Sequence, residues 1–154
     1  MVYVALSLPQ ARALRAGEPL DRARGHAATT SLRRKLAVAE GDEEGDFAAL
    51  NAAGVAALDG LGGSRRLVLA AEVGASQVVD AHGGFGEVQV EELTWSQVQS
   101  LFADEEAAGP AVVAAAQAAT GVDQSQAYDL PAVVALTDTY DLLWFAPAEL
   151  DALG

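Results

Sequence analysis

Two uninterrupted apolar segments dominate the pattern of hydrophobic and polar positions along this chain. The first lies within residues 66–73 and the second within residues 141–146. A strand covered on both faces has no polar side, so its apolar residues follow one another without alternation. We therefore predict that both segments are strands buried between layers of helices.

Other strands are indicated by alternation of apolar and polar residues. Residues 2–8 place four aliphatic side chains on one side, and residues 87–91 alternate valines with Glu and Gln. A period of two is typical of strands, and the polar half of residues 87–91 predicts a half-exposed strand near an edge. Residues 77–79 and 100–103 are shorter strand candidates.

Helices are predicted where apolar residues recur at spacings of three and four between capping residues. The longest begins after Asp42, has an acidic first turn, and is expected to bury Phe47, Leu50 and Leu58. Residues 18–29 show no clear period and are predicted to be loop. The capping, Pro and Gly signals together predict helices near residues 9–17, 30–41, 42–61, 94–97, 110–121 and 147–154, with one further turn after Pro131.

The order of these elements predicts a single α/β domain covering residues 1–154. Helices that alternate with strands favour a mixed or mainly parallel sheet of four to five strands with helices packed on it. A two-layer ferredoxin-like α+β arrangement uses the same elements if residues 100–103 are not a strand. The two apolar segments favour the first arrangement.

Charge is divided unevenly along the chain, whose net charge is −13. All nine basic residues lie at or before Arg66, whereas the remaining 88 residues carry fourteen acids and no Lys or Arg. An acidic C-terminal half repels phosphate backbones, so we expect no nucleic acid as a partner. A basic segment packed beside the acidic one would balance part of this charge.

Several other classes are excluded or disfavoured by composition. The chain has no cysteine, which removes disulfides, thiolate nucleophiles and cysteine metal sites. It has no run of 18 uncharged apolar residues, so we expect no membrane span. The first residues lack a basic region before their apolar run, which predicts a cytoplasmic protein without a signal peptide.

Two acidic clusters are candidates for a metal site. Asp42 and Glu43 lie in one cluster and Asp104 and Glu105 in the other, both at expected junctions of loop and helix. Hard cations need oxygen ligands from several elements, and two such clusters could supply them. Neither cluster matches a calcium-loop motif, and solvated helix caps explain each of them without a ligand, which disfavours a metal site.

No complete catalytic or cofactor motif is present. The glycine-rich residues 60–65 lack the Gly-Lys-Ser/Thr ending of a phosphate loop and lead from a helix into a strand, the reverse of the required topology. His26 and His82 both lie in expected loops, without an evident acid partner or serine nucleophile. The aromatic residues Trp95, Trp144 and Phe145 are expected to fill the core. We expect no cofactor.

Three segments carry a resemblance to a known family. Residues 40–44, which lead into an alanine-rich helix, and residues 65–71 and 142–146 together resemble an actinobacterial family of small proteins of unknown function, over most of the chain. That family has a histidine where this chain has Tyr140, which argues against a histidine-based site there. The resemblance implies no activity, cofactor or catalytic residue.

These observations favour a non-enzymatic protein-interaction or regulatory domain. Its acidic C-terminal half would meet a basic protein partner, or the domain would pair with itself. The alternative is a metal-assisted hydrolase that uses Asp42, Glu43, Asp104 and Glu105. The two differ in whether the acidic clusters converge on one pocket.

Overall fold

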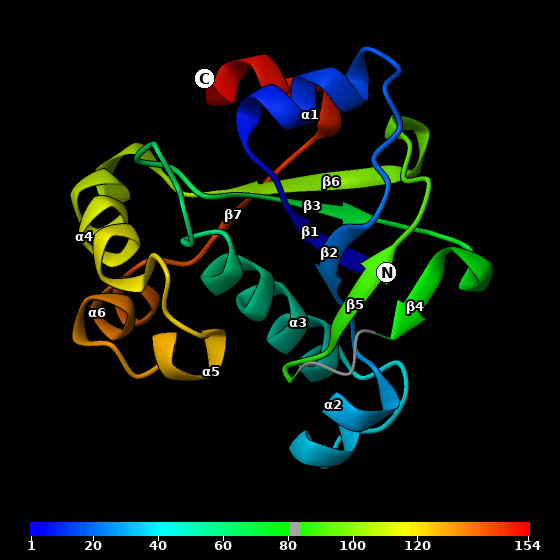
Figure 1. The fold of residues 1–154 in the computed structure, drawn as a ribbon, viewed down its shortest axis with the longest axis horizontal. Helices are drawn as coiled ribbons and strands as arrows, with labels where there is room; N and C mark the ends of the chain where they lie inside the picture. The colour runs from blue at the N-terminus through cyan, green and yellow to red at the C-terminus, as the bar shows by residue number, and fades with distance from the viewer. Residues whose placement is uncertain (81–83) are drawn as a thin grey trace.

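The sheet of this protein has seven strands, and every neighbouring pair is antiparallel (Figure 1). The computed structural model describes residues 1–80 and 84–154. In spatial order the strands are β4 (Val78–Asp80), β5 (Glu87–Val90), β2 (Ala23–His26), β1 (Val2–Ala5), β3 (Leu67–Ala71), β6 (Val98–Ala103) and β7 (Leu143–Phe145).

Strands β1 and β3 form the centre of the sheet because apolar side chains cover both of their faces. All five residues of β3 are buried, which confirms the prediction for residues 66–73. In β1, Val2 and Val4 point into one core, whereas Tyr3 points into another on the opposite face. A strand with no polar side can lie only between two covering layers.

Helices cover the two faces of the sheet separately. Helix α1 (Leu8–Arg15) and the C-terminal 3₁₀ helix η4 (Pro147–Leu153) pack on the face that carries Val2 and Val4. Helices α2 (Thr30–Leu36) and α3 (Glu43–Ala56) pack on the opposite face, which we call the α3 face. Figure 1 shows these two layers on opposite sides of the sheet.

A third core lies between helices alone. Val55 and Leu58, at the end of α3, pack with α4 (Gly109–Ala119), α5 (Gln124–Ala127) and α6 (Pro131–Thr139). The single turn expected after Pro131 is therefore a nine-residue helix. Short 3₁₀ helices complete the structure: η1 (Ala75–Gln77), η2 (Trp95–Gln97) and η3 (Glu106–Ala108).

The predicted mixed or mainly parallel sheet of four to five strands is wrong, because all six pairs of neighbouring strands are antiparallel. The four-stranded ferredoxin-like alternative does not match seven strands either. The main cause is β2, which lies in residues 18–29 where a loop is predicted. Its sequence does not alternate because Gly25 packs where a side chain would clash: a Cβ there would lie 2.8 Å from Cγ1 of Val2. Ala23 is a small core residue on the same face as Gly25, and Arg24 and His26 on the other face form polar contacts, so no apolar stripe is visible.

Residues 141–146 do contain a strand, β7, but the prediction that it is buried is wrong. β7 is an edge strand, in which Leu143 is 42% exposed and Trp144 is 62% exposed. The expectation that Trp144 fills the core fails with it, whereas Trp95 and Phe145 do pack against the main core. A continuous apolar run indicates a strand, but it cannot distinguish a covered strand from an exposed edge.

Other expectations are confirmed in outline. Residues 77–79, 87–91 and 100–103 correspond to β4, β5 and β6, and β5 lies second from the edge. Asp42 is the N-cap of α3, where its carboxylate accepts a hydrogen bond from the Glu44 N–H at 3.1 Å. The buried stripe of α3 consists of small residues, Ala49, Ala52 and Ala53, whereas the expected core residue Phe47 is 59% exposed.

Within the described residues, no helix combines the length and the apolar content that spanning a bilayer requires.

Candidate functional site

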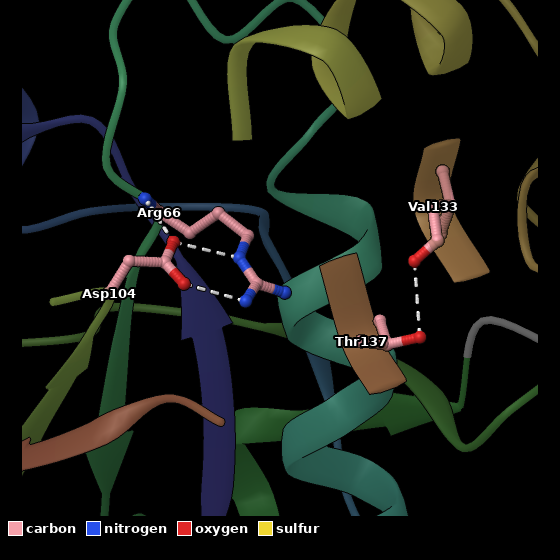
Figure 2. A network of polar contacts seen from close by, with 4 residues as sticks. All are labelled: Arg66, Asp104, Val133 and Thr137. Carbon is pink, nitrogen blue, oxygen red and sulfur yellow. Dashed lines mark hydrogen bonds and ion pairs between the residues drawn. The ribbon is translucent and has the colours of Figure 1, made fainter. Parts of the chain in front are cut away.

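Asp104, one of the four candidate metal ligands, is held in a buried ion pair with Arg66 (Figure 2). Its Oδ1 accepts a hydrogen bond from Nη2 at 2.7 Å, and its Oδ2 accepts from Nε at 2.8 Å and from the backbone N–H of Arg66 at 2.9 Å. Both side chains are almost completely inaccessible to solvent. The carboxylate therefore serves to neutralise a buried guanidinium at the ends of β3 and β6.

The two acidic clusters lie at opposite ends of α3. Asp42 caps the N-terminus of the helix, whereas Arg66 Nη1 approaches Gly54, where a Cβ would lie 3.2 Å away. Twelve helical residues between these points correspond to roughly 18 Å along the axis. Asp104, which is paired with Arg66, is thus far from Asp42 and Glu43, so the structure does not bring the four residues together.

The remaining candidates, Glu43 and Glu105, are exposed. Among the described residues, no three His, Asp or Glu side chains are grouped closely enough to hold a metal ion. His82 lies outside the described residues. Any cation at the surface would have to take its protein ligands from one cluster alone, with water completing its coordination.

A polar cluster surrounds His26, which lies in β2 and not in the expected loop. Gln124 of α5 is its centre: the side-chain oxygen accepts a hydrogen bond from Arg24 at 2.5 Å and lies 3.4 Å from His26 Nε2. The Gln124 amide also donates to the carbonyl of Ala52 at 2.9 Å. Glu87 of β5 forms an ion pair with Arg24 at 2.7 Å. These bonds join β2, β5, α3 and α5.

Burial holds this histidine in its neutral form. Loss of solvation, with a smaller effect of the nearby Arg24 cation, lowers the pKa of His26 to about 4 despite the opposing effects of Gln124 and Glu87. Burial likewise raises the pKa of Tyr128, in the same cluster, to about 12. The imidazole is almost completely buried, and its contact with Gln124 belongs to a network of hydrogen bonds that holds α5 against β2 and α3.

The α3 face is covered over only part of its width. Helix α3 packs on β1, β2 and β3, and the sheet continues beyond it into β6 and β7. Phe102 of β6 and Trp144 of β7 are directly opposite each other, so their side chains share this face. Trp144 is the most exposed large apolar residue in the described part of the chain.

An open groove continues this apolar surface along α3. It has a volume of about 420 Å³ and is lined by Tyr3, Phe47, Leu50 and three acidic residues, Glu43, Glu44 and Asp46. Tyr3 and Phe102 connect it with the uncovered sheet face, because their rings meet edge to face with centroids 6.3 Å apart. Burial, together with the Asp46 carboxylate, raises the pKa of Tyr3 to about 12, so its hydroxyl stays protonated.

We call this surface the aromatic face: Tyr3, Phe47, Leu50, Phe102 and Trp144, with Glu43, Glu44 and Asp46 at its rim. None of the three acids forms an ion pair with another described residue. Phe47 follows an acidic run and Trp144 follows Asp141, but helical spacing and a continuous apolar run predict core positions for these two aromatics. Large apolar patches rimmed by polar residues are typical of interaction sites.

Comparison with known proteins gives a family but no activity. No curated protein and no solved structure matches the chain. One family model, described as a family of unknown function (DUF6912), matches residues 1–153. Because this match covers nearly the whole sequence, the chain belongs to the DUF6912 family of unknown function.

Proposed function

We propose that this protein is a non-enzymatic interaction domain whose aromatic face binds a basic segment of a partner protein. The observation that carries the proposal is the exposure of Trp144 on the α3 face of β7, where it is 62% exposed beside the half-buried Phe102. Buried aromatic anchors supply most of the binding energy in protein interfaces, and tryptophan is the most enriched of them.

The edge strand offers a way for such a segment to bind. β7 is the last strand of the sheet, and no described strand pairs with its outer edge. An extended peptide added there would form backbone hydrogen bonds, and every second side chain would lie on the α3 face next to Trp144. The backbone thus supplies affinity, and the aromatic face selects an apolar side chain.

The charges favour a basic partner over a second copy of this chain. Glu43, Glu44 and Asp46 line the groove without ion-pair partners among the described residues, so a Lys or Arg of the partner would find free carboxylates. Two copies would each bring a net charge of −13. Facing like charges cost free energy at an interface, whereas opposite charges steer association.

Selection from a library of short random peptides displayed on phage tests this proposal. We expect enriched sequences that combine Lys or Arg with one aromatic or aliphatic anchor. In fluorescence anisotropy titrations, Trp144→Ser and Phe47→Ser should each weaken a selected peptide at least tenfold, since interface anchors contribute more than about 1.4 kcal/mol. Raising the ionic strength from about 0.05 M to about 0.3 M should weaken binding of the same peptide to the wild type, because salt screens the attraction between the acidic residues and the peptide.

The matched control is Val113→Ser, which removes an exposed apolar side chain from α4, outside the aromatic face. It should leave the affinity unchanged. Enrichment of acidic or uncharged peptides, binding that survives both aromatic substitutions, or no enrichment at all would contradict the proposal. So would a dimer in sedimentation experiments that Trp144→Ser dissociates, because the occupant would then be a second copy.

Two further expectations remain part of this proposal. Cytoplasmic location and an actinobacterial source stay predictions from the sequence, and fractionation of the native cells tests the first. For the alternative of a metal-assisted hydrolase, the arrangement of Asp42, Glu43, Asp104 and Glu105 offers no shared site that favours it.

A further inference from the structure

A second cavity lies on the opposite face of the sheet from α3. It has a volume of about 400 Å³ and forms where β1, β3 and β6 end beneath the start of α1 and the end of η4. Its apolar lining includes five leucines: Leu6, Leu8, Leu61, Leu67 and Leu153. Ligand pockets have volumes of about 300–1,000 Å³ and are mainly apolar, with a few polar groups that orient the ligand.

Arg65 is the charged residue of this cavity. Arg66 is buried, and two further arginines, Arg33 and Arg65, are half-buried. Arg33 pairs with Glu40 and Arg66 with Asp104, but Arg65 has no carboxylate partner among the described residues. Its Nη1 donates only to the carbonyl of Leu153, at 3.0 Å. A half-buried guanidinium therefore has donors left for an anion.

The loop beside Arg65 has further free donors. Gly62, Gly63 and Ser64 line the same cavity, and none of their backbone N–H groups donates to a described residue. Because the two glycines lack side chains, a ligand can approach this part of the backbone closely. Backbone N–H groups without partners, next to a cation, are available to donate hydrogen bonds to an anion.

We propose that this cavity binds a small amphiphilic carboxylate, such as a medium-chain fatty acid. The apolar tail lies among the leucines, and the carboxylate faces Arg65 and the N–H groups of Gly62 and Gly63. The volume is at the small end of the range for ligand pockets, which suits one short chain and not a long lipid. The chain is acidic overall, but at physiological ionic strength salt screens the repulsion between the bound carboxylate and acids more than about 8–10 Å away.

The composition of the cavity also argues against a nucleotide. A nucleoside phosphate needs polar groups for its base and sugar and several cations for its phosphates, whereas this lining is mostly leucine with one arginine. A carboxylate needs one guanidinium, which it can bind through two parallel hydrogen bonds.

Titration of the full chain with decanoate, followed by amide NMR and isothermal calorimetry, tests the proposal. We expect saturable binding, with shifts at the amides of Gly62, Gly63 and Leu153. Each methylene added between hexanoate and decanoate should tighten binding by about fourfold until the cavity is filled. Decanol, which lacks the charge, should bind at least tenfold more weakly than decanoate.

Arg65→Gln should weaken decanoate at least tenfold and leave decanol unchanged, whereas Arg34→Gln, on the exposed side of α2, should change neither. The wild-type shifts locate the ligand even if Arg65→Gln folds poorly. Absence of saturable binding, shifts that map to Trp144 and Phe47, or equal affinities for decanol and decanoate would overturn the proposal. Decyl phosphate binding tenfold tighter than decanoate would overturn the choice of a carboxylate.

Discussion

Replacing Asp104 with asparagine should lower the free energy of unfolding by about 3–5 kcal/mol, because the guanidinium of Arg66 would stay buried without its counter-charge. Asparagine has nearly the same shape, so the change removes the charge and little else. Chemical denaturation of the wild type and the variant, monitored by circular dichroism, measures the difference. A loss below about 1 kcal/mol would show that the ion pair is not needed for stability.

Two further variants separate charge from packing. Asp138→Asn changes an exposed carboxylate of α6 and should alter stability by no more than about 0.5 kcal/mol. The double variant Arg66→Met/Asp104→Leu removes both charges and should recover at least half of the loss, since an apolar pair of similar volume avoids desolvation. Treatment of the wild type with EDTA should leave its melting temperature unchanged if Asp104 acts only as the partner of Arg66.

Lowering the pH should remove about 3 kcal/mol of stability through His26 alone. Its pKa is about 4 in the folded protein and about 6.5 in the unfolded chain, so the unfolded state binds the proton more readily. This contribution is fully present above pH 6.5 and is lost as the pH falls from 6.5 through about 4. The groups that face the imidazole are Arg24, Glu87 and Gln124.

NMR titration of the His26 ring, together with denaturation at several pH values, measures this effect. Carboxylates also titrate in this range, so the informative quantity is the difference between the wild type and His26→Gln. The variant should show a shallower fall in stability between pH 6.5 and pH 4. A ring pKa near 6.5 would contradict the prediction, and so would parallel pH profiles of the two proteins.

The two apolar segments show that the local sequence pattern predicts a strand but does not predict whether that strand is buried. Both were correctly predicted to contain strands, because an uninterrupted apolar run with β-favouring flanks determines conformation locally. Only the first segment proved to be buried, at residues 66–71, since α1 and η4 lie on one side of β3 and α3 lies on the other. Residues 141–146 have the same pattern, yet β7 is the last strand of the sheet: Leu142 packs toward α3, whereas Leu143 and Trp144 are exposed.

For the candidate sites, too, some features can be predicted from the local sequence and others depend on tertiary packing. The acidic residues Glu43, Glu44 and Asp46 could be placed on the first turn of a helix from sequence, because their position after an N-cap is a local feature. The sequence does not predict that these acids line a groove with Tyr3 and Phe47. It also does not predict that the two acidic clusters lie far apart. The cavity that contains Arg65 is formed by segments from both ends of the chain, so no short motif describes it.

By itself, the sequence determined that a strand lies within residues 66–73, that α3 starts at its Asp42 cap and that everything after Arg66 is acidic. These properties depend on neighbouring residues or on composition. Only the tertiary structure decided that Ala23–His26 is a strand, that Arg66 pairs with a carboxylate 38 residues away, and that Trp144 faces solvent. Each of these depends on which distant segments pack together, and periodicity contains no information about the partner.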